Sequence, residues 1–164
     1  MTPDTLGAAL AATVEELDGI GAADEALAVL REGRGISVLR GQPRMMPVGR
    51  AWRLGVILLD RSGGLYATGE ITRAIEPMVA VTNRSAAAEQ KREYRRAAAR
   101  GPFAEGETIN HEFTPIDLAP DALRAGSGPL SLGDNDEILV QLASGSRIPL
   151  EGYLADRVAL FTLD

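Results

Sequence analysis

The sequence predicts one α+β domain over residues 1–164, built on a mainly antiparallel sheet that could be strongly curled. A chain of 164 residues can bury one hydrophobic core but is too short for two ordinary domains. Strand candidates outnumber helix candidates, and most are joined by short turns, whereas a parallel sheet needs a long crossover between its strands. An N-terminal helical hairpin and one arginine-rich surface helix are expected to cover this sheet.

Two helices are predicted at the N-terminus. Thr2 offers a hydroxyl N-cap and Pro3 suits the first helical position. Apolar residues then recur at helical spacing, at Leu6, Leu10, Val14 and Leu17. After a glycine-rich break, residues 22–32 are predicted to form a second helix that presents Leu27 and Leu30. These two helices make up the expected helical hairpin.

The next segment should carry the chain into the sheet. Residues 35–40 are predicted to form a short strand, and residues 41–50 a loop, because two prolines and two glycines disfavour regular structure there. Residues 52–59 are largely apolar on both sides of an extended chain, which predicts one strand covered on both faces. Its first face should hold Trp52, Leu54, Val56 and Leu58. A glycine-containing turn at residues 60–64 then leads into a returning strand at 65–68.

The middle of the chain is dominated by one charged helix. Residues 70–76 fit either a strand or a helix, and residues 78–82 favour a short strand. Ser85 is a suitable N-cap for a helix that runs to Arg100 and ends at a glycine–proline step. Tyr94 is its only large apolar side chain, so this helix should lie largely on the surface.

The C-terminal third alternates short strands with turns. Its strands are predicted at residues 107–113, 130–132, 138–142 and 158–163. Short helices are predicted at residues 120–123 and 149–156. An acidic turn at residues 133–137 should join the two middle strands as a hairpin, and it lacks the closing glutamate of a calcium-binding EF-hand loop.

The composition excludes several classes of site. Cysteine is absent, which rules out disulfides, zinc–thiolate centres and cysteine nucleophiles. No apolar run approaches the roughly 20 residues of a membrane span, and the first helix lacks the basic start of a signal peptide. A cytoplasmic protein without membrane contact is therefore predicted. Arginine supplies every basic side chain except Lys91 and the single histidine, which together with many alanines and glycines indicates a GC-rich bacterial genome.

Charge is unevenly distributed along the chain. The net charge is −6, but residues 1–32, 33–100 and 101–164 carry −6, +8 and −8. A basic middle segment could bind phosphate, nucleic acid or carboxylate ligands. The favoured interpretation is that the acidic flanks fold back on the basic segment and neutralise it, because an acidic chain repels nucleic acid at long range.

The best candidate ligand site is a run of arginines in residues 33–59, which contain no acid. The predicted ligand-binding residues are Arg40, Arg44, Arg50 and Arg53. Planar guanidinium groups bind carboxylate or phosphate with two parallel hydrogen bonds. The leading hypothesis is a non-catalytic binding or interaction module that takes an anionic small molecule or an acidic protein partner and forms a homo-oligomer. The alternative is that these arginines pair with acids elsewhere in the chain.

Two other functions stay open. A small hydrolase or transferase would use His111, the only histidine, as base, with Glu112 or Asp117 as the orienting carboxylate. Position 115 is a proline, so the second histidine of a zinc-protease motif is missing, and no metal or cofactor site is predicted. A nucleic-acid interface would instead use the predicted helix of residues 85–100, through Arg92, Arg95 and Arg96. A buried lone histidine and a solvated charged helix face are the commoner explanations of these two patterns.

Overall fold

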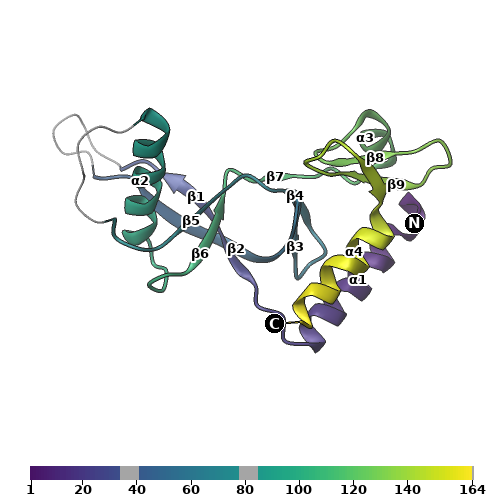
Figure 1. Cartoon of the computed structure of the whole chain (residues 1–164), viewed down its shortest axis with the longest axis horizontal. Coiled ribbons are helices and arrows are strands. Elements are labelled where there is room, and N and C mark those ends of the chain that lie inside the picture. Colours follow the sequence, from purple (N-terminus) through teal and green to yellow (C-terminus); the bar gives the residue numbers. More distant parts are fainter. Residues whose placement is uncertain (34–40, 78–84, 164) are drawn as a thin grey trace. The chain divides into compact units, whose positions relative to one another are not determined.

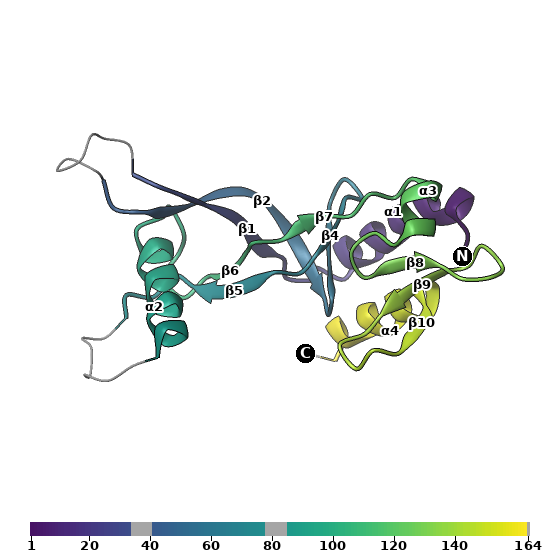
Figure 2. The ribbon, with the colours of Figure 1, turned by 90° about the horizontal axis from the view of Figure 1, so that it is seen from above.

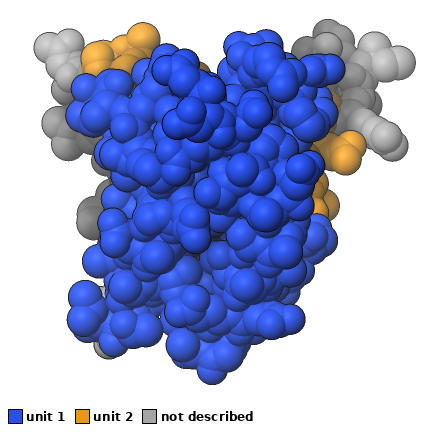
Figure 3. Space-filling model, turned by 90° about the vertical axis from the view of Figure 1, so that its right-hand side faces the viewer, with its two compact units in different colours: residues 1–24, 51–68, 113–164 blue, residues 25–50, 69–112 orange. Residues whose placement is uncertain are grey.

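The computed structural model describes residues 1–33, 41–77 and 85–163 (Figure 1). Those residues form an α+β fold with four helices and a mostly antiparallel set of strands, as the sequence predicts. They separate into two compact units. Unit 1 comprises Met1–Asp24, Ala51–Thr68 and Phe113–Asp164, which Figure 3 shows gathered in one body, and unit 2 comprises Glu25–Arg50 and Gly69–Glu112. The strands predicted at residues 35–40 and 78–82 lie outside the described residues.

Two long helices lie side by side in unit 1 (Figures 1 and 2). The helix α1 (Pro3–Gly19) begins where the sequence predicts, and the Thr2 N–H donates to the Thr5 hydroxyl at 3.0 Å. Its neighbour is α4 (Leu150–Phe161). The predicted apolar stripe of α1 enters the core of unit 1 through Leu6, Leu10 and Leu17.

The strands of unit 1 form two successive hairpins. Residues 51–54 of β2 (Arg44–Leu54) pair with β3 (Ile57–Asp60). Next in the antiparallel order come β4 (Leu65–Ala67) and β7 (Thr114–Pro115). The predicted turn at residues 60–64 is confirmed, because the backbone N–H of residue 60 donates to the carbonyl of residue 64 at 3.0 Å.

The prediction of one strand over residues 52–59 is wrong. The chain reverses at Gly55 and Val56, so that Leu54 lies opposite Ile57 in the hairpin. Gly55 has a φ of +69°, which glycine adopts without the steric cost that a Cβ would bring. The residues that enter the core are therefore Trp52, Leu54, Ile57 and Leu59, instead of the alternation expected for one continuous strand.

A three-stranded antiparallel sheet completes the strands of unit 1. It contains β8 (Leu130–Leu132), β9 (Ile138–Gln141) and β10 (Arg147–Pro149), and the short helix α3 (Pro120–Ala125) precedes it. The hairpin predicted around residues 133–137 is confirmed by a 2.8 Å hydrogen bond from the N–H of residue 133 to the carbonyl of residue 137.

The final strand predicted at residues 158–163 is wrong, because α4 continues to Phe161. Leu150, Leu154 and Val158 are buried and repeat every four positions, which places them on one helical face. Packing of this whole face against the core outweighs the local preference of the Val-Ala-Leu-Phe-Thr-Leu sequence for a strand.

Unit 2 combines a sheet with one helix. Its strand order is β5 (Glu70–Arg73), β6 (Thr108–His111), β1 (Glu25–Arg31) and then residues 44–50 of β2. β5 and β6 are antiparallel, whereas β1 and β6 are parallel. The helix α2 (Ala86–Ala99) packs on β5 and begins as predicted, with the Ser85 hydroxyl accepting from the Ala88 N–H at 3.3 Å.

The helix predicted over residues 22–32 is wrong, because this segment forms β1. Ala26 and Ala28 belong to one buried cluster with Ala97 and Ala98 of α2. Alanine favours helices locally, but pairing with β6 and burial in this cluster stabilise the strand. The expected N-terminal helical hairpin therefore does not form.

The loop predicted at residues 41–50 is also wrong over most of its length, since β2 begins at Arg44. The pairing of β2 with β3 covers residues 51–54, so residues 44–50 form an edge of the described unit 2 sheet, beside β1. An edge strand tolerates Pro47, whose nitrogen has no hydrogen to donate.

Each unit has its own hydrophobic core. The core of unit 1 contains large side chains such as Trp52 and Tyr153. The core of unit 2 consists of alanines together with Met45 and Ile109. None of the described helices is long and apolar enough to span a lipid bilayer.

Candidate anion-binding site

The arginines predicted to bind an anion are divided between the two units. Arg40 lies outside the described residues. Arg44 and Arg50 belong to unit 2, whereas Arg53 belongs to unit 1. Arg44 is exposed, and together with Arg31 it lines an open cavity of about 680 Å³. The described arginines of the predicted set therefore do not line one common site.

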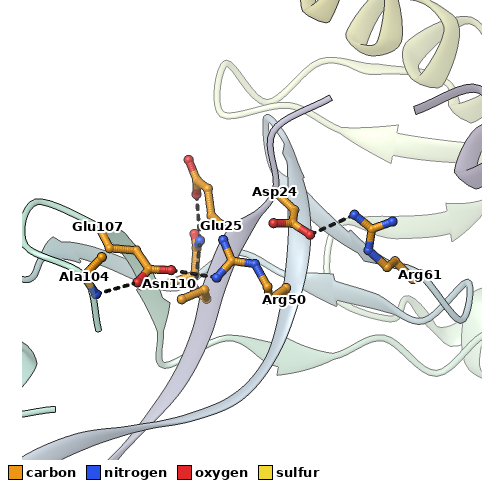
Figure 4. Close-up of polar contacts among 8 residues, drawn as sticks. Asp24, Glu25, Arg50, Arg61, Ala104, Glu107 and Asn110 are labelled. Atoms are coloured by element: carbon orange, nitrogen blue, oxygen red, sulfur yellow. Dashed lines mark hydrogen bonds and ion pairs between the residues drawn. The ribbon is translucent and has the colours of Figure 1, made fainter. Parts of the chain in front are cut away.

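Arg50 is held by an acid from the C-terminal third of the chain (Figure 4). Its Nη1 donates to Glu107 Oε1 at 2.6 Å, and Glu107 Oε2 accepts from the Ala104 N–H at 3.0 Å. Both Arg50 and Glu107 line a cavity of about 320 Å³ with Phe103. Because the carboxylate lies beside the guanidinium, the net charge that this cavity presents to an anion is small. Arg50 thus fits the alternative of an intramolecular ion pair.

Arg53 lines a different pocket, which contains a second arginine. This pocket, of about 150 Å³ in unit 1, is lined by Arg53, Gly55, Arg157, Leu160 and Phe161. We refer to these five residues as the arginine pocket. None of these lining residues is acidic, whereas Glu107 lines the Arg50 cavity.

The guanidinium of Arg157 is oriented by an aromatic ring. Its Cζ lies 5.0 Å from the centroid of Tyr153, one helical turn earlier in α4. This cation–π contact holds the guanidinium over the ring. Arg157 Nε is buried and has no hydrogen-bond acceptor among the described residues. Buried donors in proteins usually have an acceptor, which can be a protein group, a bound water or a ligand.

The β2–β3 turn forms the opposite wall of the arginine pocket. The Tyr153 hydroxyl donates to the Leu54 carbonyl at 2.5 Å and accepts from the Val56 N–H at 2.9 Å. These two bonds fix the turn against α4. A Cβ on Gly55 would lie 3.4 Å from Arg157 Nε, so the turn packs closely against the guanidinium at a residue without a side chain.

Arg157 was not among the residues singled out from the sequence. The predicted helix at 149–156 and strand at 158–163 leave Arg157 at a junction between elements. In the observed helix it follows Tyr153 by four positions and precedes Phe161 by four. The four-residue repeat of Leu150, Leu154 and Val158 is the signal that could have revealed this neighbourhood.

The predicted catalytic residues lie in different units. His111 is 1% exposed, and its ring centroid lies 4.4 Å from that of Tyr94. Neither of its ring nitrogens has a hydrogen-bond partner among the described residues. The Tyr94 hydroxyl donates instead to Glu112 at 2.5 Å. Asp117 belongs to unit 1, where its Oδ1 accepts from the Ala119 N–H at 2.9 Å.

The surroundings of His111 favour its neutral form. Burial lowers the pKa of His111, and the negative charges of Glu112 and Glu70 oppose this shift without reversing it. A neutral imidazole packed against a tyrosine ring fits a structural role in unit 2. The hydroxyl of Tyr94, by contrast, has its pKa raised by its hydrogen bond to Glu112.

The three cations of the predicted nucleic-acid interface have unlike environments. The side chain of Arg92 is only 7% exposed, and its Nη1 lies 3.9 Å from Glu89. Arg96 is paired with Glu93 and, at 3.2 Å, with Glu89. Arg95 is exposed. They therefore do not form one uniform row of exposed charges.

The described residues form no cluster of metal ligands. In residues 1–33, 41–77 and 85–163, no group of three or more histidine, aspartate or glutamate side chains is placed to hold a metal ion. Comparison of the chain with protein-family models, with curated proteins and with solved structures gives no match.

Proposed function

We propose that this protein is a non-catalytic binding module whose anionic ligand docks in the arginine pocket. The observation that carries the proposal is a pocket lined by two arginines and by no acid, in which Arg157 has a buried Nε without an acceptor among the described residues. An anionic oxygen in the pocket would accept hydrogen bonds from the guanidinium of Arg157. The sequence-based hypothesis of an arginine-lined site is thus kept, with Arg53 retained and Arg157 added.

The energetics of buried donors support this proposal. A buried polar group without a partner costs about 1–3 kcal/mol, and a hydrogen bond to a charged group returns a similar amount. A ligand carboxylate or phosphate can accept two parallel hydrogen bonds from one guanidinium. The position of Arg157 over Tyr153 means that little side-chain freedom is lost when the ligand binds.

Burial and ion pairing make the two other functions less favoured. An enzyme based on His111 would need a histidine that reaches its substrate, and this side chain is almost fully buried. Nucleic-acid binding through α2 would need cations that are available to phosphates, and Arg96 is engaged by two glutamates. An acidic protein, including a second copy of this chain, could offer a carboxylate to the same arginine pocket.

Substitution of Arg157 tests the proposal directly. Anion binding to the purified chain would be measured by NMR, following the amide signals of residues 53–57 and 157–161 during titration with sodium benzoate and inorganic phosphate. Arg157→Gln removes the positive charge and the paired N–H donors of the guanidinium. If benzoate or phosphate binds the wild type, the variant should bind that anion about tenfold or more weakly.

Arg124 provides the matched control for this experiment. It is an exposed arginine of α3 in the same unit, and its Nη1 pairs with Asp121 at 2.7 Å. Arg124→Gln should leave the titration unchanged. Absence of any saturable shift with either anion, or equal weakening by both substitutions, would contradict the proposal.

A further inference from the structure

The arginine pocket has an apolar side, and the following inference rests on the proposed anion site. Leu160 and Phe161 line the pocket and follow Arg157 by three and four positions, so all three lie on one face of α4. Leu160 is 50% exposed. An exposed leucine beside two guanidinium groups is a poor surface for a fully hydrated ion but a good one for an amphipathic anion.

The volume of the pocket limits the size of the group that it can take. Its roughly 150 Å³ matches the volume of an engineered protein cavity that binds benzene. A single aromatic ring or a short branched alkyl group would therefore fill it. The lining divides this volume into a cationic side, with Arg53 and Arg157, and an apolar side, with Leu160 and Phe161.

We propose that the ligand is a small organic monocarboxylate whose carboxylate is held by Arg53 and Arg157 and whose ring or short alkyl group packs on Leu160 and Phe161. This ligand class has one group that suits the cationic side of the pocket and one that suits the apolar side. A carboxylate has two coplanar oxygens, which match two parallel N–H donors of a guanidinium group. A phosphate would place further hydrated oxygens against the apolar side and lose their hydration without gaining donors there.

A titration series separates charge from apolar contact. The full-length chain would be titrated by NMR with benzoate, acetate, benzyl alcohol and inorganic phosphate, following residues 53–57 and 157–161. Benzoate should give saturable shifts in the millimolar range. Acetate keeps the charge but lacks the ring, and benzyl alcohol keeps the ring but lacks the charge, so each should bind at least about tenfold more weakly.

Two leucines near the end of α4 give a matched pair of variants. Leu160→Ser removes part of the apolar side and should weaken benzoate several-fold while leaving acetate unchanged. Leu163→Ser, at a residue that is 79% exposed and does not line the pocket, should change neither. Both positions are exposed, so the variants are expected to fold, and circular dichroism would verify this.

The outcomes distinguish failure of the ligand class from failure of the anion site. Phosphate binding as tight as benzoate binding, with loss of both in Arg157→Gln, would overturn the monocarboxylate while leaving the anion site intact. Benzyl alcohol binding as tightly as benzoate would show that the pocket is merely apolar, and both proposals would fall. The same holds for a titration in which no probe shifts these signals. If Arg157→Gln does not fold, Arg53→Gln removes the other positive charge that lines the pocket and tests the same anion site.

Discussion

The hydroxyl of Tyr153 shows how one side chain can join two elements of unit 1. It donates to the Leu54 carbonyl and accepts from the Val56 N–H, so it uses both of its hydrogen-bonding capacities on the β2–β3 turn. This close approach is possible because Gly55, between the two bonded residues, has no side chain. The ring beneath that hydroxyl also orients Arg157, so the geometry of the turn and that of the arginine pocket depend on each other.

We expect Gly55→Ala to destabilise unit 1. A Cβ at this position would lie 2.4 Å from the Tyr153 hydroxyl oxygen, and the φ of +69° is unfavourable for alanine. The free energy of unfolding, measured by urea denaturation, should fall by about 1–3 kcal/mol. Gly152→Ala is the control, because a Cβ there meets nothing within 4 Å and alanine favours the interior of α4. This variant should gain about 0.5–1 kcal/mol.

His111 should make the stability of the protein depend on pH. Its pKa in the folded state is lowered from 6.5 by burial, against the opposing charges of Glu112 and Glu70, so the unfolded chain takes up the proton first as pH falls. The stabilisation is complete above about pH 6.5 and is lost as pH decreases toward the folded pKa.

The test compares melting temperatures of the wild type and His111→Phe between about pH 5 and 7.5, a range chosen around the unperturbed histidine pKa. Phenylalanine can retain the packing on the Tyr94 ring but cannot take up a proton. The wild type should lose stability on acidification more steeply than the variant. Equal slopes over this range would mean that His111 titrates alike in the folded and unfolded states.

The strand β1 illustrates how an element can be misjudged from its own residues. Its alanines and leucines favour a helix locally, yet the chain is extended because β6 on one side and residues 44–50 of β2 on the other supply hydrogen bonds. The small side chains of Ala26 and Ala28 belong to the same buried cluster as Ala97 and Ala98 of α2. Close packing inside such a cluster leaves little room for larger side chains.

Enlarging one of these alanines should therefore destabilise unit 2. Ala28 is fully buried, and Ala28→Leu would overpack this buried cluster at a cost of about 1–3 kcal/mol in the free energy of unfolding. Val29→Leu, at the next position, is the control, because Val29 is 37% exposed and the change should stay within about 0.5 kcal/mol. Similar losses in both variants would argue against a tight contact at Ala28.

The two units are interleaved along the chain. The backbone passes from one to the other after Asp24, Arg50, Thr68 and Glu112. Neither unit therefore corresponds to one continuous stretch of sequence, and β2 contributes residues to both. The single domain expected from chain length stays a prediction for the molecule as a whole. The large apolar side chains of unit 1 bury more surface per residue than the alanines of unit 2, so each residue of the unit 1 core should contribute more to stability.

The uneven charge of the sequence is partly balanced inside each unit. In unit 1, Arg61 from the basic middle segment pairs with Asp18 from the acidic start. It also pairs, at 3.1 Å, with Asp24 of the same segment (Figure 4). In unit 2, Arg50 pairs with Glu107 from the acidic end. These pairs are the neutralisation that the charge pattern favours. Pairs as exposed as these contribute little to stability, so their main effect is to reduce repulsion within the basic segment.

The sequence by itself determined those features whose hydrogen bonds close within a few residues. The start of α1 at Thr2, the cap of α2 at Ser85 and the turns at 60–64 and 133–137 were all predicted and are observed. In each case the donor and the acceptor are near neighbours in the chain, so local residue types are sufficient to specify the bond. The assignment of Arg53 to a ligand site stays a prediction, although the acid-free arginine run behind it is also a local property.

Only the tertiary structure decided the features whose partners are distant in the chain. β1 is a strand because β6 pairs with it from residue 108 onward, and the reversal at Gly55 is held by Tyr153, almost a hundred residues later. Arg157 joins Arg53 in one pocket for the same reason. Hydrogen bonding and burial act between neighbours in space, and a local pattern cannot specify which distant residue that neighbour will be.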